Sequence, residues 1–238
     1  MKGYRSDPNR VLMTTTDSNG WGAAAYRRAA PSVYYLPMDV VAVLGPICTA
    51  LSVSLVWPQV IRVYRLNTVE GLAPNGTLHG LAACTLWTMY GVARGVGPLI
   101  VSNGAIGVAM LMIAAAQIRH RRLGIGKLLA VATGILVLGT AALAVSTSLA
   151  GWTAIVVGVT SILPQTVHAA KAADLSAVSL PMYGLLLLNA ALWSVYGLLI
   201  GDHLIIVTNI LIAPCALFVA MKAWRSRAAP LPLATEIL

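Results

Sequence analysis

The sequence predicts an all-α membrane protein of seven transmembrane helices, arranged as two parallel three-helix bundles joined by an inversion linker helix (3+1+3). Three observations predict this fold. The 238-residue chain is 58% hydrophobic and 10% charged, whereas soluble domains carry about 25% charged residues. Its apolar residues form seven long runs, and the first three runs match the last three at a constant offset. The composition excludes a disordered protein, a coiled coil and a typical soluble enzyme.

Each run is close to the length of about 20 apolar residues that a helix needs to cross a hydrocarbon core. Backbone groups in lipid are satisfied only in helices or closed barrels, and continuous runs lack the alternation of barrel strands. Helices are therefore expected, with short connections that make neighbours antiparallel. The runs are Val40–Val60, Leu78–Val96, Pro98–Ile118, Leu128–Val145, Gly151–Ala170, Leu180–Ile200 and Leu204–Met221.

Lysine and arginine gather in alternate loops, which predicts the orientation. The basic residues expected on the cytoplasmic side are Arg62, Arg65, Arg119, Arg121, Arg122, Lys127, Lys171, Lys222, Arg225 and Arg227. The opposite loops between helices hold only Arg94. We therefore expect a multi-pass protein of the plasma membrane with the N-terminus outside and the C-terminus cytoplasmic. The net charge of +9 is a topology signal, so no nucleic-acid partner is expected.

The predicted domains follow from these runs. Residues 1–37 are polar, rich in turn formers and expected to be disordered. This basic stretch lacks an apolar signal-peptide core; it is either an unstructured tail or an extension ahead of a start at Met13 or Met38. Residues 38–122 form the first repeat, 123–149 the linker helix, 150–225 the second repeat and 226–238 a cytoplasmic tail.

An internal repeat with an offset of 106 residues relates the two halves. The aligned pairs are Pro58-Gln59 with Pro164-Gln165, Trp87 with Trp193, Tyr90-Gly91 with Tyr196-Gly197, and Asn103 with Asn209. Chance rarely aligns such residues in one frame. Because three helices are an odd number, tandem units would face opposite ways, and the unpaired fourth helix restores a parallel orientation. Parallel repeats place a substrate site between them near the membrane midplane.

These residues carry a resemblance to a known family. Pro-Gln at the end of the first and fifth helices, Trp-x-x-Tyr-Gly on the second and sixth, and Asn on the third and seventh are similar to the SWEET sugar transporters. Each half resembles a bacterial SemiSWEET within the wider PQ-loop group. The resemblance covers about Met38–Arg225, and Trp followed 16 residues later by Asn in both halves is its most specific part. It implies a seven-helix sugar transporter.

Two asparagines and two tryptophans are the main candidates for substrate contact. An unpaired amide in hydrocarbon costs several kcal/mol, so Asn103 and Asn209 either bond a neighbouring helix or face a polar solute. Their donors and acceptors suit sugar hydroxyls. Trp87 and Trp193 lie about ten residues into their runs, too deep for interface anchors, and offer flat faces to a sugar ring. The resemblance places all four in the substrate pocket.

Residues one helical turn before the motif residues are expected to line the same cavity. They are Ser54 and Thr160, before the two prolines, and Ala83 and Asn189, before the two tryptophans. In the family, the matching positions help to set which sugar fits. Close helix packing is the alternative role for Ser54, Thr160 and Ala83. Asn189 has no counterpart in the first half, so an asymmetric pocket is expected.

Prolines and charged residues are the candidates for hinges and gates. Proline removes a helical hydrogen bond and permits a kink. With Gln59 and Gln165, a set of four prolines resembles the SWEET proline tetrad on the cytoplasmic side: Pro58, Pro74, Pro164 and Pro181. SemiSWEET outer gates contain a Tyr together with an Arg and an Asp. The pairs Tyr90 with Arg94 and Tyr196 with Asp202 resemble such a gate. We expect Arg94 and Asp202 to pair at the outer mouth; the alternative is two solvated loop charges.

The charge pattern bears on energy coupling. No Asp or Glu lies inside any run, whereas an ion-coupled carrier usually needs an intramembrane ionisable residue. The sequence therefore predicts bidirectional facilitative uniport of mono- or disaccharides by alternating access. The alternative is a PQ-loop transporter of another small polar solute, such as an amino acid. A photosensor is disfavoured because Lys222 lies at the end of the last run.

Neither cofactor nor metal is expected, and the chain is not expected to be an enzyme. No nucleophile–base constellation lies at membrane depth. His79 and His203 begin helices without a second ligand at metal spacing and are interpreted as interfacial residues. The three cysteines are far apart inside apolar runs and are interpreted as small core residues. The expected partners are a sugar and the bilayer, and assembly into a homo-oligomer is left open.

Overall fold

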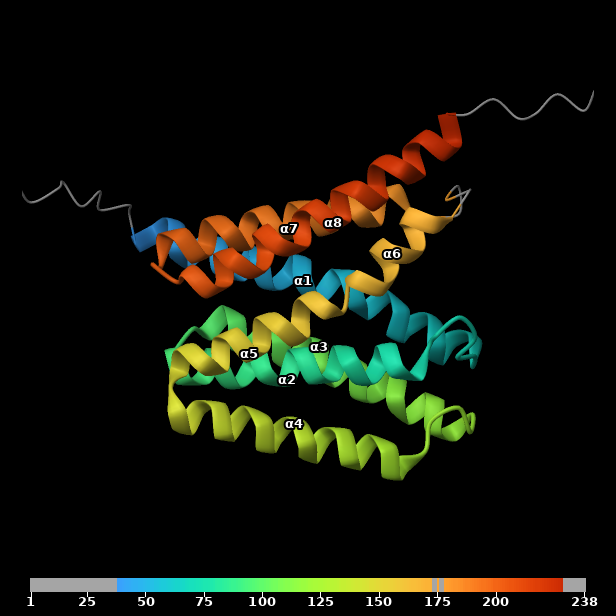
Figure 1. Ribbon diagram of the computed structural model, residues 1–238, viewed down its shortest axis with the longest axis horizontal. Helices are drawn as coiled ribbons and strands as arrows, with labels where there is room; N and C mark the ends of the chain where they lie inside the picture. The colour runs from blue at the N-terminus through green and yellow to red at the C-terminus, as the bar shows by residue number, and fades with distance from the viewer. Residues whose placement is uncertain (1–37, 173–174, 176–177, 229–238) are drawn as a thin grey trace, which may run out of the picture. The chain divides into compact units, whose positions relative to one another are not determined.

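The computed structural model describes residues 38–172, 175 and 178–228. All regular elements in this part are α-helices (Figure 1). They are α1 (Met38–Leu66), α2 (Pro74–Arg94), α3 (Gly97–Arg119), α4 (Ile125–Val145), α5 (Thr147–Thr160), α6 (Leu163–Lys171), α7 (Leu180–Leu199) and α8 (His203–Ala228). The predicted disordered tail 1–37 and residues 229–238 of the predicted cytoplasmic tail lie outside the described residues.

The seven apolar runs all become helical, but the fifth run divides into α5 and α6. The break follows from Pro164 in the first turn of α6, because proline cannot donate to the preceding turn and clashes with its carbonyl. The backbone N–H groups of Ser161 and Ile162 instead donate to carbonyls only three residues earlier, those of Gly158 and Val159, at 3.1 and 3.2 Å. The matching proline in the first half, Pro58, lies inside an unbroken α1. The same motif therefore breaks a helix in one repeat only.

Five of the helices in the described part are long and apolar enough to cross a bilayer: α1, α3, α4, α7 and α8. We assign the two remaining crossings to α2 and to α5 with α6. Two hydroxyls of α2 are satisfied within the helix, since those of Thr85 and Thr88 donate to the carbonyls four residues earlier. Large exposed apolar residues lie along the described helices, as expected for a surface that faces lipid.

The helix packing repeats itself between the halves. In the first half α3 packs against both α1 and α2, and in the second half α8 packs against α5, α6 and α7. Across the halves, α1 packs against α7 and α5 packs against α2, which are equivalent pairs under the 106-residue offset. The unpaired helix α4 covers α2 and α5 (Figure 1). This pattern confirms the predicted 3+1+3 arrangement.

The two repeats share one core at one end of the bundle. It draws Trp87 and Tyr90 from the first repeat and Trp193 and Tyr196 from the second. We call this the tyrosine end. At the other end each repeat buries residues in clusters of its own, such as Val60, Ala109 and Ile113 in the first and Ile162, Tyr183, Ala216 and Val219 in the second. The halves are thus packed together at the tyrosine end and are separately packed at the opposite end.

The opposite end carries the positive charge. It holds the C-terminal ends of α1, α3, α6 and α8 and the α3–α4 connection (Figure 1), where the basic residues of the predicted cytoplasmic side lie. We call it the basic end. Lys222 donates to the carbonyls of Ala169 and Ala170 at 2.7 and 2.8 Å, so one of these cations satisfies the last turn of α6. The segregation of Lys and Arg read from the sequence is therefore present in three dimensions.

A glycine of each repeat lets the other repeat approach at the tyrosine end. A Cβ atom at Gly45 would lie 2.5 Å from Pro98 Cγ and 3.2 Å from a ring carbon of Tyr196. At the equivalent Gly151, it would meet Leu204 and, at 2.9 Å, a ring carbon of Tyr90. These partners are themselves equivalent under the offset. Each tyrosine therefore packs against a glycine of the opposite repeat.

Replacing Gly45 by alanine is expected to destabilise the fold, because the proline ring that the new methyl group meets cannot rotate away. Overpacking of this kind costs about 1–3 kcal/mol, so the melting temperature of the protein in detergent should fall. Gly104→Ala is the control, since a Cβ atom at Gly104 in α3 meets no atom within 4 Å. Equal melting temperatures for the two variants would contradict the close packing described around Gly45.

Candidate functional site

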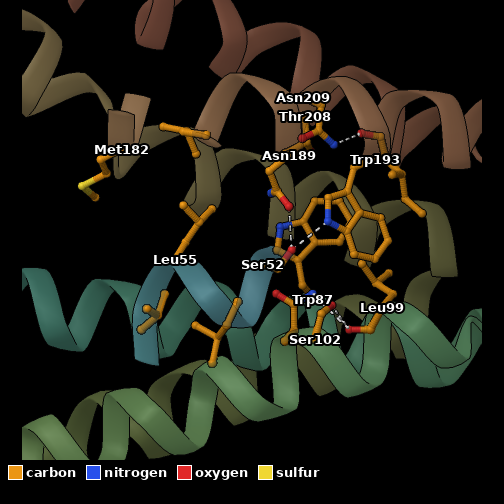
Figure 2. Close-up of a pocket in the computed structure, with 15 residues that line it drawn as sticks. Ser52, Leu55, Trp87, Leu99, Ser102, Met182, Asn189, Trp193, Thr208 and Asn209 are labelled. Atoms are coloured by element: carbon orange, nitrogen blue, oxygen red, sulfur yellow. Dashed lines mark hydrogen bonds between the residues drawn. The ribbon is translucent and has the colours of Figure 1, made fainter. Parts of the chain in front are cut away.

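A cavity of about 350 Å³ lies between the two repeats, within the size range of small-molecule sites. Figure 2 shows its walls. The lining residues are Ser52, Leu55, Val56, Trp87, Leu99, Ser102, Asn103, Ile106, Met182, Leu186, Asn189, Trp193, Ile205, Thr208 and Asn209. Every one of these side chains is uncharged. The cavity is thus apolar with a few convergent polar groups, as expected for a site that binds a small neutral molecule.

The two tryptophans lie where the cavity meets the shared core. Trp87 packs edge-on against Tyr90, with ring centroids 5.6 Å apart, and Trp193 packs against Tyr196 at 5.5 Å. Both indoles are almost fully buried. Edge-to-face packing of this kind holds an aromatic ring in place. The cavity therefore has two rigid indoles at its closed end, one from each repeat.

The two asparagines are held in the same way by their own helices. Asn103 Nδ2 donates to the carbonyl of Leu99 at 3.0 Å, and Asn209 Nδ2 donates to the carbonyl of Ile205 at 2.8 Å. In each case the partner lies four residues earlier, and the two partners are equivalent under the offset. The carboxamide oxygens have no hydrogen-bond donor among the described residues. Each asparagine can therefore offer an acceptor to a molecule in the cavity.

Five of the eight predicted pocket residues line this cavity: Trp87, Asn103, Asn189, Trp193 and Asn209. The structure places Ser54, Thr160 and Ala83 outside its lining. The hydroxyl of Ser54 is exposed and donates to the carbonyl of Leu51 at 2.7 Å. The hydroxyl of Thr160 donates to the carbonyl of Val157 at 2.9 Å. The residues one helical turn before the prolines, Ser54 and Thr160, therefore do not face the cavity, because α1 and α5 present other faces to it.

Sequence reasoning missed three hydroxyl residues in the lining. Ser52 lies on α1, two positions before the serine that was predicted. Ser102 and Thr208 directly precede the two asparagines, and they are equivalent under the 106-residue offset. That equivalence is the signal that would have found them. The hydroxyl of Thr208 is buried without a hydrogen-bond partner among the described residues.

The predicted gate residues of the tyrosine end meet across the repeats. Tyr90 Oη donates to the carboxylate of Asp202 at 2.8 and 2.9 Å, and Arg94 Nε lies 3.4 Å from the same group. The carboxylate is 2% exposed and also accepts from the backbone of Leu204 and Ile205. It therefore caps α8. Asp202 is not a solvated loop charge, whereas the side chain of Arg94 is 45% exposed.

The equivalent positions around Tyr196 lack this polar cluster. Position 96, which is equivalent to Asp202, is Val96, and the hydroxyl of Tyr196 makes no hydrogen bond within the described part of the chain. The tyrosine end is thus closed by one polar cluster and one apolar contact.

The predicted hinge residues lie at the basic end. Pro74 and Pro181 are in the first turns of α2 and α7, where a missing N–H costs nothing. Pro58 is exposed and Gln59 is half-buried on α1. The backbone of Pro164 and Gln165 belongs to α6, but their side chains lie outside the described part.

His79 is more than an interfacial residue. It is half-buried on α2, and its Nε2 lies 2.6 Å from the carbonyl of Val157 in α5. This carbonyl is left without its usual helical donor by the break after α5. No group of His, Cys, Asp or Glu side chains in the described residues is arranged to hold a metal ion.

Comparisons with known proteins agree with this fold and site. A family model described as a sugar efflux transporter for intercellular exchange matches residues 146–222, and a PQ-loop repeat model matches residues 40–100. A solved structure of a eukaryotic SWEET transporter is similar, with a TM-score of 0.66 and 16% identity. The similarity covers 80% of this chain and all of that one. No curated protein sequence is significantly similar to the chain.

The paired helical repeats around a neutral cavity, with one family model matching in each repeat, define a membrane transporter for small solutes. More specifically, the sugar efflux transporter model matches the second repeat and the PQ-loop repeat model matches the first, which supports the SWEET family of sugar transporters.

The asymmetry of the tyrosine end gives a matched test. Tyr90→Phe removes a donor from the buried Asp202 carboxylate, and a hydrogen bond to a charged group contributes about 1.5–3 kcal/mol. We expect a lower melting temperature in detergent. Tyr196→Phe should leave the melting temperature close to that of the unmodified protein, because this hydroxyl has no partner in the described residues. A larger effect of Tyr196→Phe would contradict the assignment.

Proposed function

We propose that the protein is a bidirectional facilitative uniporter that moves a mono- or disaccharide across the plasma membrane by alternating access. The observation that supports this most directly is the cavity between the repeats, with an equivalent indole and carboxamide from each. The segregation of basic residues supports a cytoplasmic basic end, an outer tyrosine end, an outside N-terminus and a cytoplasmic C-terminus.

The lining suits a neutral, hydroxylated solute. The flat apolar faces of Trp87 and Trp193 match the C–H surface of a sugar ring. The carboxamide oxygens of Asn103 and Asn209 can accept hydrogen bonds from hydroxyl groups. An amino acid would bring an ammonium and a carboxylate into a cavity that has no charged side chain to pair with them, and burying unpaired charge is costly.

The same neutrality supports uniport. Coupling to protons or sodium usually requires an ionisable group at membrane depth, and none lines the cavity. The buried Asp202 lies at the tyrosine end, where its carboxylate is already engaged by Tyr90, Arg94 and the start of α8. A solute would therefore move down its own gradient.

Alternating access follows from the unequal packing of the two ends. The repeats share a core at the tyrosine end and are packed separately at the basic end, as in a carrier closed outside and open inside. The reverse state requires the Arg94–Asp202 contact and both tyrosine–glycine contacts to separate. The break between α5 and α6 and the proline-initiated ends of α2 and α7 supply points at which the basic end could close.

The proposed function is tested by uptake of labelled glucose and sucrose into liposomes without any ion gradient. Wild type should take up at least one of them. Asn103→Ala and Asn209→Ala should each reduce uptake by about tenfold or more, the effect of losing roughly 1.4 kcal/mol of interaction with the solute. Asn75→Ala is the matched control, because Asn75 lies outside the cavity and bonds Lys127. Uptake that requires a pH gradient would contradict uniport.

The outer gate is tested at Arg94, whose partner Asp202 has too many roles to be exchanged. Arg94→Gln removes one charge of a partly exposed pair, which contributes up to about 1 kcal/mol, so the rate should change by about two- to fivefold. Arg94→Lys keeps the charge and should stay closer to wild type. Reversing both charges should not restore transport, since an arginine at position 202 cannot accept from Tyr90 or cap α8. Wild-type rates for Arg94→Gln would contradict a gating role.

A further inference from the structure

Two positions break the internal symmetry of the cavity. Ser52 on α1 is equivalent to Gly158 on α5, and Asn189 on α7 is equivalent to Ala83 on α2. Both differences place a polar group on the same side of the cavity, next to Trp193. The equivalent surroundings of Trp87 have no side-chain oxygen from these positions. The two tryptophans therefore occupy equivalent positions, but only Trp193 has polar side chains from these two positions beside it.

Ser52, Trp193 and Asn189 form a directed chain of hydrogen bonds. Trp193 Nε1 lies 2.9 Å from Ser52 Oγ, and Ser52 Oγ lies 2.9 Å from Asn189 Oδ1 (Figure 2). An indole N–H can only donate, so the serine oxygen accepts from Trp193 and gives its own hydrogen to Asn189. The carboxamide oxygen of Asn189 is thus engaged, and its amino group keeps two donors.

The position of Ser52 shows that this chain serves the cavity. Ser52 is 6% exposed and lines the cavity, and its hydroxyl bonds two residues of another helix, Asn189 and Trp193 of α7. The hydroxyls of Ser54 and Ser194 instead donate to carbonyls of their own helices. The packing of α1 against α7 brings Ser52 to Asn189 and Trp193, which are separated from it by more than half of the chain.

The other side of the cavity lacks this restraint. A Cβ atom at Gly158 would lie 3.3 Å from Trp87 Nε1, so the glycine occupies the place from which a serine could reach this nitrogen. Among the described residues Trp87 Nε1 has no hydrogen-bond acceptor. Its N–H therefore stays available to a molecule in the cavity, whereas the N–H of Trp193 is engaged by the protein.

We infer that Ser52 is a specificity-determining positioning residue, which holds the Asn189 carboxamide so that its amino group donates to an oxygen of the sugar on one side of the cavity only. The inference rests on the proposed function, because it assigns a role toward that same solute. The two sides then differ in what they offer: Asn189 presents fixed amide donors, and Trp87 presents an unengaged indole N–H. A sugar would bind in one preferred orientation about the axis between the repeats.

The test is a double-mutant cycle on liposome uptake, with KM and the maximal rate measured separately for the sugar that wild type transports. Ser52→Ala and Asn189→Ala should each raise KM by about tenfold with a smaller effect on the maximal rate. In the Asn189→Ala background, Ser52→Ala should add less than about twofold, because groups that act through one another are not additive. Ser52→Thr, which keeps the hydroxyl, should restore most of the affinity. Ser194→Ala is the matched control.

The outcomes separate the inference from the function on which it rests. Failure of wild type to take up either sugar overturns both. Normal wild-type uptake with Ser52→Ala equal to Ser194→Ala overturns the inference alone, as does a double variant whose KM is the product of the two single effects. Should Ser52→Ala fail to fold, Ser52→Cys, which has a weak donor and acceptor in the same place, takes its position in the cycle.

Discussion

The close approach of the two repeats at the tyrosine end is the constraint on which the rest of the structure depends. Each tyrosine packs against a glycine of the opposite repeat, and no larger residue fits at Gly45 without displacing the rigid ring of Pro98. This contact brings both tryptophans into one core and fixes the closed end of the cavity. Because the repeats share no such core at the basic end, the cavity lies at the point where their packing diverges.

The architecture could be predicted from the sequence because it rests on patterns that survive without coordinates. Apolar runs, loop charges and a constant offset predict seven helices and two parallel repeats, and these features are confirmed. The pocket was harder to predict. The Trp and Asn pairs line the cavity, but Ser54 and Thr160 do not, because a one-turn rule does not say which face α1 and α5 present. Ser52 had no signal of its own, since its role arises only from the packing of α1 against α7.

Identical motifs in the two repeats also differ in local structure. The two Pro-Gln motifs are identical, yet Pro58 lies within a continuous α1, whereas α5 ends before Pro164. A proline removes one hydrogen bond wherever it stands, and the surrounding packing decides whether the helix continues. At the break the carbonyl of Val157 contacts His79 and accepts from the hydroxyl of Thr160, because the backbone N–H of Ser161 bonds Gly158 instead. The two halves therefore share the same helix order but differ in whether the first helix of the repeat is interrupted.

Covalent fusion of the repeats has a chemical consequence at Ser52 and Gly158. A pore assembled from two copies of one short chain would carry every substitution twice, so a polar group added beside one indole would also appear beside the other. When the two copies are joined through α4 in one chain, a substitution can occur in one repeat without occurring in the other. One side of the cavity can then carry a fixed donor that the other side lacks, and a solute with two unlike faces can be bound in one of its two orientations related by rotation about the axis between the repeats.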